Sequence, residues 1–388
     1  MAIPQSNPLD APNPNAALAY WPYSNLSTNY GRPYTCHELY NRLLDARSAE
    51  EILQPEFMTI SIERRGPSNG PSDPFLPRLL TALSEHEDIS TLFLHDVDWS
   101  HFASRHLWHS SIIGFPNITY LTMTDCSLQA DEFFSLVRSL PLQGLEVHNC
   151  SITGALHVHP FSTDASSLIP NHEGPEILYL DVTVSQDSNI LEIFTQPWSP
   201  VSFSKLEKLA ISGKGDSDIG QQIARLVELS TPLELNIDCD GFNLVHPPPI
   251  AKLSEVKNLV VVIPLDGTHD FRRTNDCLRW WTSSLKQVPR PNRISDIRIV
   301  VMVDQQSIAN VANLPSGGRA TQWIYFDEVL SDTKKFKLHH RFGVTISMKQ
   351  NTATGTLFDT QVYNTWIQSD ALVESFERYL GISLRRHA

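Results

Sequence analysis

The sequence is poor in cysteine, has no excess of positive charge and contains no long apolar run. Its 5 cysteines are far apart and form no Cys-x-x-Cys pair, which argues against a disulfide framework, a zinc knuckle and a thioredoxin-like site. Reduced, buried thiols are the expected state. The 30 lysines and arginines are outnumbered by 43 acidic residues, which gives a net charge of −13. A nucleic-acid partner, which needs a basic face, is therefore not expected.

Membrane and secretory signals are also missing from the sequence. No segment approaches the roughly 18 consecutive apolar residues that a membrane helix needs. The apolar run 259–265 is too short and contains Pro264, so we interpret it as a buried strand. The N-terminal segment MAIPQSNPLDAPNPNAALAYWPYS has neither the basic nor the apolar region of a secretory signal. We therefore expect no membrane segment and a cytoplasmic or nuclear location.

In place of these features, the chain has a globular composition and a repeated apolar motif. It is 41% hydrophobic and 19% charged, a balance too apolar for general disorder. The motif has the form apolar-x-x-apolar-x-apolar. Its copies lie 24 to 38 residues apart, close to the period of about 20–29 residues of a leucine-rich repeat. The middle residues of the copies are Ile60, Leu92, Leu121, Leu145, Leu180, Leu209, Leu235, Leu259 and Ile297.

Two copies match a fuller pattern, L-x-x-L-x-L-x-x-N/C-x-L. They begin at Ile118 and Leu142, and they place Cys126 and Cys150 at the N/C position. A small side chain at this position can form a hydrogen bond with the backbone where it turns inside the repeat. We therefore assign the two cysteines a structural role rather than a redox role.

Helical patterns between the motif copies complete the predicted fold. Strands and helices that alternate in this way form a right-handed coil. We predict an α/β fold, specifically a leucine-rich-repeat-like solenoid with a curved parallel sheet and helices on its convex side. The repeats occupy residues 34–305, residues 1–33 form a poorly ordered arm, and residues 306–388 form an irregular C-terminal cap. Within the cap, residues 342–348 alternate as a strand and residues 370–380 form a closing helix. The apolar residues of the helical patterns include Leu79, Leu80, Leu83, Phe133, Phe134, Val137, Ile223, Leu226, Val227, Cys277, Leu278, Trp281 and Leu285.

Few residues suggest catalysis. The sequence has no P-loop, dinucleotide-binding, nucleophile-elbow or His-Glu-x-x-His motif. Glu146 and His148 share one face of a predicted strand and are acid–base candidates, while His157 and His159 are spaced to share a metal ion. A hydrolase or metal enzyme that uses these four residues is one alternative. The favoured prediction is a protein without enzymatic activity, metal or cofactor.

The repeat predicts where a partner would bind. Residues on either side of the middle apolar position point to the concave face of the sheet, because side chains alternate along a strand. This face combines aromatic, hydroxyl and acidic side chains, which suits a protein partner better than a polyanion. We therefore predict a non-enzymatic interaction scaffold. Its candidate partner-binding residues are Phe93, His95, Tyr120, Thr122, Thr124, Glu146, His148, Tyr179 and Asp181.

The segments ISTLFLHDVDW, GFPNITYLTMTDCSL and LPLQGLEVHNCSI resemble the leucine-rich part of fungal F-box proteins, an expanded group in mushrooms. In that family a phrase of the type F-P-N-I-T-x-L-x-L opens a repeat, and V-x-W closes the preceding one. The resemblance covers residues 35–300 approximately. It implies a substrate receptor of a cullin-type ubiquitin ligase, in which the F-box docks the ligase adaptor and the repeats hold the substrate.

The resemblance does not extend to the F-box itself. That module opens with a Leu-Pro-x-Glu-like signature, and residues 1–33 contain neither the signature nor a helical pattern. No adaptor-binding residue is therefore assigned. A ligase substrate receptor, with the adaptor as a second partner, is the first alternative function.

Overall fold

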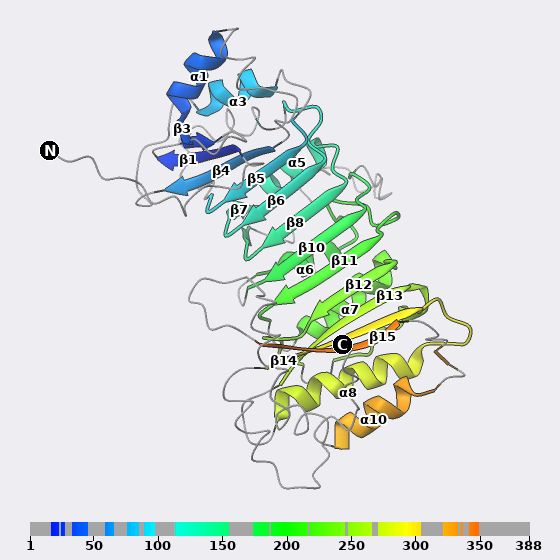
Figure 1. The fold of residues 1–388 in the computed structure, drawn as a ribbon. Coiled ribbons are helices and arrows are strands. Elements are labelled where there is room, and N and C mark those ends of the chain that lie inside the picture. Colours follow the sequence, from blue (N-terminus) through cyan, green and yellow to red (C-terminus); the bar gives the residue numbers. More distant parts are fainter. Residues whose placement is uncertain are drawn as a thin grey trace, which may run out of the picture. The chain divides into compact units, whose positions relative to one another are not determined.

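The structure is a computed structural model (Figure 1). It describes residues 17–22, 25–27, 33–45, 59–65, 76–84, 89–97, 112, 114–154, 174–185, 188–215, 218–244, 247–265, 271–303, 321–332, 335–336 and 341–348. These residues form an α/β fold with a mostly parallel main sheet. Within the same residues, no helix is both long and apolar enough to cross a bilayer.

The chain divides into two compact units. The first contains Met1–Asp181 and Asp187–Lys205, and the second contains Val182–Gln186 and Leu206–Ala388. The strand β10 (Tyr179–Val184) contributes its first three residues to the first unit and its last three to the second.

In the first unit the main strands neighbour one another in the order β1, β4, β5, β6, β8 and β10. The pairs from β1 to β8 are parallel. Two small sheets accompany them, an antiparallel pair of β2 with β3 and a parallel pair of β7 with β9. The elements are β1 (Ala17–Pro22), β2 (Asn25–Ser27), β3 (Pro33–Thr35), α1 (Cys36–Leu44), β4 (Thr59–Arg65), α3 (Leu76–Ser84), β5 (Thr91–His95), β6 (Tyr120–Thr124), β7 (Ser127–Gln129), α5 (Ala130–Ser139), β8 (Gly144–His148), β9 (Ser151–Thr153), β10 and α6 (Ile190–Thr195).

In the second unit the strands β11 to β15 follow one another in chain order and pair in parallel. The elements are β11 (Lys208–Gly213), α7 (Ile219–Ser230), β12 (Glu234–Asp238), the 3-10 helix η2 (Leu253–Glu255), β13 (Asn258–Pro264), α8 (Arg272–Gln287), β14 (Asp296–Val303), α10 (Thr321–Leu330) and β15 (Arg341–Met348).

The middle residues of the repeated motif lie side by side in the sheet. In the first unit Leu92 pairs with Leu121, and Leu121 pairs with Leu145. These residues and their counterparts in the second unit are at most 1% exposed. The spacing of the motif therefore correctly predicted which residues become neighbours. In the second unit the consecutive partners are Leu209, Leu235, Leu259 and Ile297.

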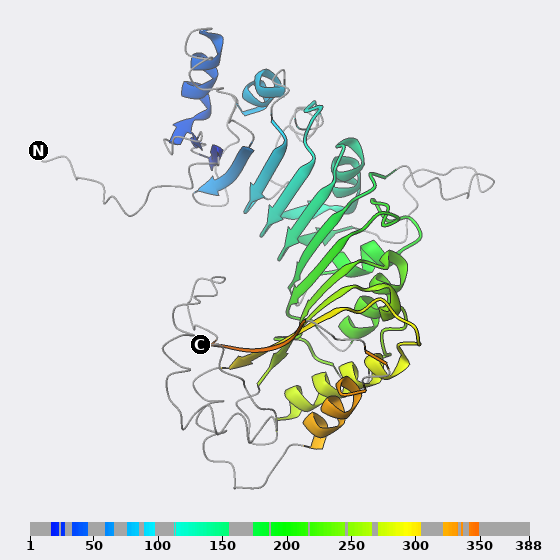
Figure 2. The same ribbon diagram turned by 45° about the vertical axis from the view of Figure 1, so that its right-hand side comes forward.

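Within each unit, helices lie on one side of the strands (Figure 2). In the first unit α3 and α5 occupy this side, and in the second unit α7 and α8 do so. The helices form because their apolar residues recur every three or four positions and can be buried together. All thirteen apolar residues named for these patterns are buried, which confirms the helical predictions.

Both segments expected at the ends of the repeats contain strands of the main sheet. β1, from the predicted arm, pairs in parallel with β4, and β15, from the predicted cap, pairs in parallel with β14. Each satisfies backbone groups that an edge strand would leave unpaired. The predicted strand 342–348 is confirmed, whereas the predicted helix 370–380 lies outside the described residues.

Candidate functional site

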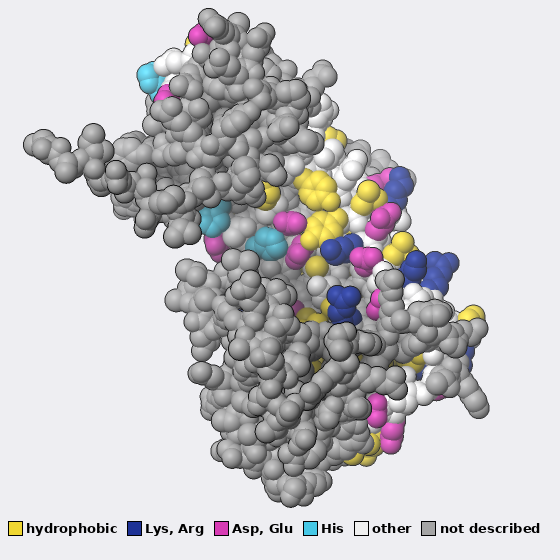
Figure 3. Space-filling view, in the orientation of Figure 1, with side chains coloured by type: hydrophobic (Ala, Val, Ile, Leu, Met, Phe, Trp, Pro, Cys, Tyr) yellow, Lys and Arg dark blue, Asp and Glu magenta, His cyan; other side chains and the backbone are white. Residues whose placement is uncertain are grey.

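The face of the first unit's sheet that is turned away from the buried core carries the candidate site. Buried and half-buried residues alternate along β5 and β10. In β8 the same alternation begins at Leu145, and the half-buried positions are Glu146 and His148. All nine partner-binding residues predicted from the sequence lie at alternate positions of β5, β6, β8 and β10, and Thr122 is buried. Acidic, histidine and apolar side chains are visible on the sheet surface, with lysine or arginine side chains beside them (Figure 3). The register forms three rows across β5, β6 and β8, namely Thr91–Tyr120–Gly144, Phe93–Thr122–Glu146 and His95–Thr124–His148.

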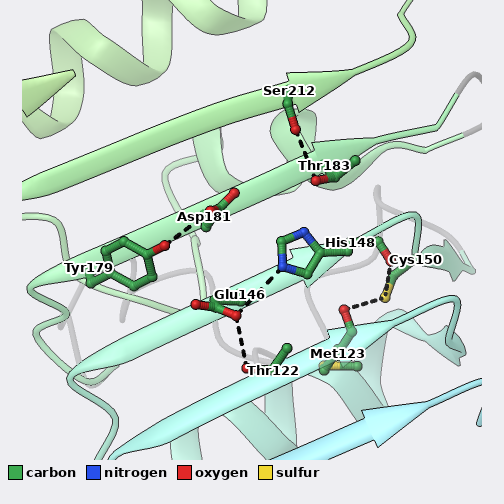
Figure 4. Close-up of polar contacts among 9 residues, drawn as sticks. All are labelled: Thr122, Met123, Glu146, His148, Cys150, Tyr179, Asp181, Thr183 and Ser212. Atoms are coloured by element: carbon green, nitrogen blue, oxygen red, sulfur yellow. Dashed lines mark hydrogen bonds and ion pairs between the residues drawn. The ribbon is translucent and has the colours of Figure 1, made fainter. Parts of the chain in front are cut away.

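Glu146 contacts side chains on two strands (Figure 4). Thr122 Oγ1, on the neighbouring strand β6, donates a hydrogen bond of 3.0 Å to Glu146 Oε2. His148 Nε2, two residues further along β8, lies 3.6 Å from the same oxygen. The side chains of Glu146 and His148 are 27% and 25% exposed, so water screens their attraction only in part. These contacts hold the carboxylate in place on the sheet face.

The pKa values of Glu146 and His148 move apart. The hydrogen bond with His148 lowers the pKa of Glu146, outweighing the opposite effect of partial burial. Partial burial alone would lower the pKa of His148. The contact with Glu146 and the negative charges of Asp181, Glu146 and Asp125 outweigh it, so the pKa of His148 is raised. Both shifts favour the ionised pair.

Tyr179 and Asp181 extend the polar contacts onto β10 (Figure 4). Tyr179 Oη donates a hydrogen bond of 3.0 Å to Asp181 Oδ2. Burial, together with the negative charges of Asp181 and Glu146, raises the pKa of Tyr179 well above its usual range. The phenol therefore stays protonated at physiological pH and keeps its role as a donor.

The ring of Tyr120 lies over Gly144 and reaches towards Tyr179. The two tyrosine ring centroids are 6.3 Å apart, with 34° between the ring planes. A Cβ atom on Gly144 would come within 2.3 Å of Tyr120 Cε1, so the glycine leaves the space that the ring occupies. Tyr120 nevertheless remains 40% exposed. We call Tyr120, Thr122, Glu146, His148, Tyr179 and Asp181 the sheet-face site.

Left-handed turns follow the strands that carry the site. Asp96, Asp125 and Asn149 come directly after β5, β6 and β8 and have φ angles of 52°, 54° and 53°. Asp and Asn tolerate this conformation better than other non-glycine residues. The backbone N–H groups of Asp96 and Asp125 each donate a 2.9 Å hydrogen bond to the last residue of the next strand, Thr124 and His148 respectively. The turns thus tie the ends of neighbouring strands together.

Two residues of this region were missed by the sequence-based prediction of the site. Asp125 Oδ2 lies 3.6 Å from His95 Nε2, so the turn adds an acidic group beside a predicted residue. Gly144 makes room for the ring of Tyr120. A signal for each was present: Asp125 follows a strand directly, and Gly144 aligns with Tyr120 when successive motif copies are superimposed.

The two cysteines of the fuller motif have the structural role that the sequence predicted. Cys126 Sγ lies 3.4 Å from the carbonyl oxygens of Leu94 and Thr124. Cys150 Sγ lies 3.4 Å from the carbonyl oxygen of Met123. Both cysteines are at most 1% exposed, and burial raises the pKa of the Cys126 thiol. The thiols therefore donate weak hydrogen bonds to buried carbonyl groups.

The contacts of Glu146 differ from those of a hydrolytic triad. In such a triad the imidazole stands between the hydroxyl group and the carboxylate. Here the carboxylate of Glu146 stands between the hydroxyl of Thr122 and the imidazole of His148. In the described part of the chain, no group of three or more His, Cys, Asp or Glu residues is placed to hold a metal ion. His157 and His159 lie outside that part.

Comparison with known proteins does not assign this chain to a family. A scan against protein-family models finds no match to the chain. A search of curated proteins likewise finds no similar protein.

Proposed function

We propose that the chain is a leucine-rich-repeat-like solenoid that binds a protein partner on the strand face carrying the sheet-face site. The main support is Tyr120, a large aromatic side chain that stays 40% exposed at the start of β6 on this face. Tyrosine is enriched in protein interfaces because it combines a large apolar ring with a polar tip. An exposed ring between hydrogen-bonding side chains is the composition of such an interface.

The order of the site supports the same proposal. Thr122, Glu146, Tyr179 and Asp181 are each held by a hydrogen bond to another side chain of the site. Side chains that are already fixed lose little conformational entropy when a partner binds, and this loss is a main cost of association. They also project from strands rather than from loops, so the backbone keeps their spacing.

A photo-crosslinking amino acid at position 120 tests the proposal in an extract from the source organism. Crosslinks from position 120 to one recurrent protein are expected, identified by mass spectrometry. The same reagent at Asp131, an exposed residue of α5, serves as the control position. Recovery of the same protein from both positions, or no recurrent protein from position 120, would contradict the proposal.

A substrate receptor of a cullin-type ubiquitin ligase is a second candidate function. It draws support from the paired motif residues Leu92, Leu121 and Leu145 and from the thiols of Cys126 and Cys150 on carbonyl oxygens, which fit a leucine-rich repeat of the F-box type. The direct test is affinity purification of the full chain with quantification of the ligase adaptor. A stoichiometric adaptor supports this candidate, and its absence from a preparation that retains the crosslinked partner rules it out.

A further inference from the structure

We infer that the partner bound by the sheet-face site presents an arginine side chain to the exposed ring of Tyr120 and the carboxylate of Glu146. The inference rests on the proposed function and adds the chemistry of the partner. It follows from charge, from ring geometry and from the capacity of the carboxylate to accept hydrogen bonds.

The acidic residues on the strands that carry the sheet-face site favour a positively charged group on the partner. The segments YLTMT, GLEVH and YLDVTV, which form β6, β8 and β10 and carry the sheet-face site, contain two carboxylates and no lysine or arginine, and the protonated form of His148 offsets one of the two negative charges. Asp125 adds a third negative charge at the end of β6. The chain as a whole carries −13. A partner of the opposite charge is attracted to such a surface, whereas an acidic partner is repelled.

The tyrosine rings specify what kind of cation fits. A guanidinium group stacks on aromatic faces and forms cation–π contacts more readily than an ammonium group does. The ring of Tyr120 is exposed, and its centroid lies 6.3 Å from that of Tyr179. An arginine can therefore lie against an aromatic ring while its N–H groups point to a carboxylate.

The carboxylate of Glu146 has the capacity to receive those N–H groups. A carboxylate offers about four acceptor positions, and the contacts of Glu146 with Thr122 and His148 both fall on Oε2. Because these contacts also fix the orientation of the carboxylate, a planar guanidinium meets acceptors that are already in place.

Fluorescence anisotropy with the full-length protein and short labelled peptides tests the inference. The probes are alternating Gly-Arg, Gly-Lys and Gly-Glu peptides of equal length, at about 0.15 M salt to limit long-range attraction. The Gly-Arg peptide should bind more tightly than Gly-Lys, and Gly-Glu should not bind. Tyr120→Leu and Glu146→Gln should each weaken Gly-Arg binding by about fivefold.

Two variants serve as matched controls. Tyr120→Phe keeps the aromatic ring, and Asp131→Asn removes one negative charge from the exposed surface of α5. Asp131→Asn should bind the Gly-Arg peptide as the wild type does, Tyr120→Phe should bind it more tightly than Tyr120→Leu does, and thermal melts of each variant report folding. Equal binding of Gly-Arg and Gly-Lys, equal weakening by Asp131→Asn and Glu146→Gln, or absence of Gly-Arg binding would each overturn the inference.

The crosslinking experiment tests the proposed function, and the peptide experiment tests the arginine inference, so the two can be wrong separately. If position 120 captures a recurrent partner whose crosslinked segment contains no arginine, the proposed function stands and the arginine inference is wrong. If position 120 captures nothing, the proposed function fails first. An arginine in the crosslinked segment, with the variant pattern above, supports both.

Discussion

The ion pair of Glu146 and His148 makes the stability of the fold depend on pH. The raised pKa of His148 means that its stabilising effect is complete below its ordinary value of 6.5 and is lost as the pH rises through the raised value. The lowered pKa of Glu146 means that its effect is complete above 4.5 and is lost as the pH falls through the lowered value. The pair therefore contributes most between these two values.

We predict that His148→Gln reduces the loss of stability between about pH 6 and pH 8.5. The wild type should lose up to about 1 kcal/mol of unfolding free energy from this pair over that interval, and the variant should lose none of it. Urea unfolding at both pH values measures the difference. His37→Gln, on the exposed helix α1, is the control and should behave as the wild type. An unchanged pH dependence in His148→Gln would contradict the prediction.

Gly144 and Tyr120 are predicted to be coupled. Gly144→Ala should displace the ring of Tyr120, because the added Cβ would lie 2.3 Å from Cε1. The ring is exposed and can rotate away, so the loss of stability should stay near about 1 kcal/mol. In a double-mutant cycle, Gly144→Ala should have almost no effect on near-ultraviolet circular dichroism once Tyr120→Leu is present. Equal spectral changes in both backgrounds would show that the ring does not occupy this space.

The sequence predicts which residues share this face of the sheet better than it predicts the contacts between their side chains. Alternation along a strand was enough to place Glu146 and His148 on one face, and the structure confirms that they lie 3.6 Å apart there. The ring of Tyr120 above Gly144 depends on which residues face each other across strands 24 residues apart in sequence. Only a correct superposition of the motif copies reveals that pair, and side-chain orientation adds a further unknown.

At the scale of single elements, the left-handed turns follow the sequence closely. Asn149 has a φ angle of 53° and is exposed, so Asn149→Gly should leave stability within about 0.5 kcal/mol of the wild type. Asn149→Val should cost about 1–2 kcal/mol more, because a β-branched residue clashes with its own backbone in this conformation. Denaturant unfolding compares the two. At the control position Gln143, which is not among the left-handed residues, valine should be at least as stable as glycine.

The strands are stabilised by the rows of buried apolar residues that join them. Leu121 is fully buried and has Leu92 and Leu145 as register partners, so Leu121→Asp places a charge in the core. We predict a loss of about 3–5 kcal/mol, enough to unfold the first unit. Thr124→Asp, on the opposite face of the same strand, should fold normally. Wild-type thermal melting of Leu121→Asp would show that the register is wrong.

Element prediction worked where a local pattern exists and was incomplete elsewhere. The motif residues and the helices α3, α5, α7 and α8 have strong periodicity, and their positions were predicted. The helices α6 and α10 were not. α6 has only 6 residues and α10 is apolar on most sides, so neither shows a clear amphipathic pattern. β15 was recognised as a strand, but its parallel pairing with β14 depends on contacts that a local pattern does not contain.

At the scale of the whole molecule, spacing predicted one array over residues 34–305, and the boundary between the two compact units of the chain falls within β10. Each repeat contacts mainly its neighbours, and the motif marks these neighbours without indicating where contacts become sparse. Net charge, unlike the division into units, follows from composition alone. The value of −13 therefore supports a prediction about how fast a partner associates, independently of the division into units.

Association of the Gly-Arg peptide should slow by about tenfold when salt rises from about 0.05 M to 0.5 M, because salt screens the attraction to a chain of net charge −13. Tyr120→Leu should instead accelerate dissociation, because contacts made only after docking act on the dissociation rate. Stopped-flow fluorescence separates the two rates. An association rate that does not change with salt would contradict long-range attraction. A Tyr120→Leu variant that alters association alone would mean that the ring acts during encounter and does not contact the bound arginine.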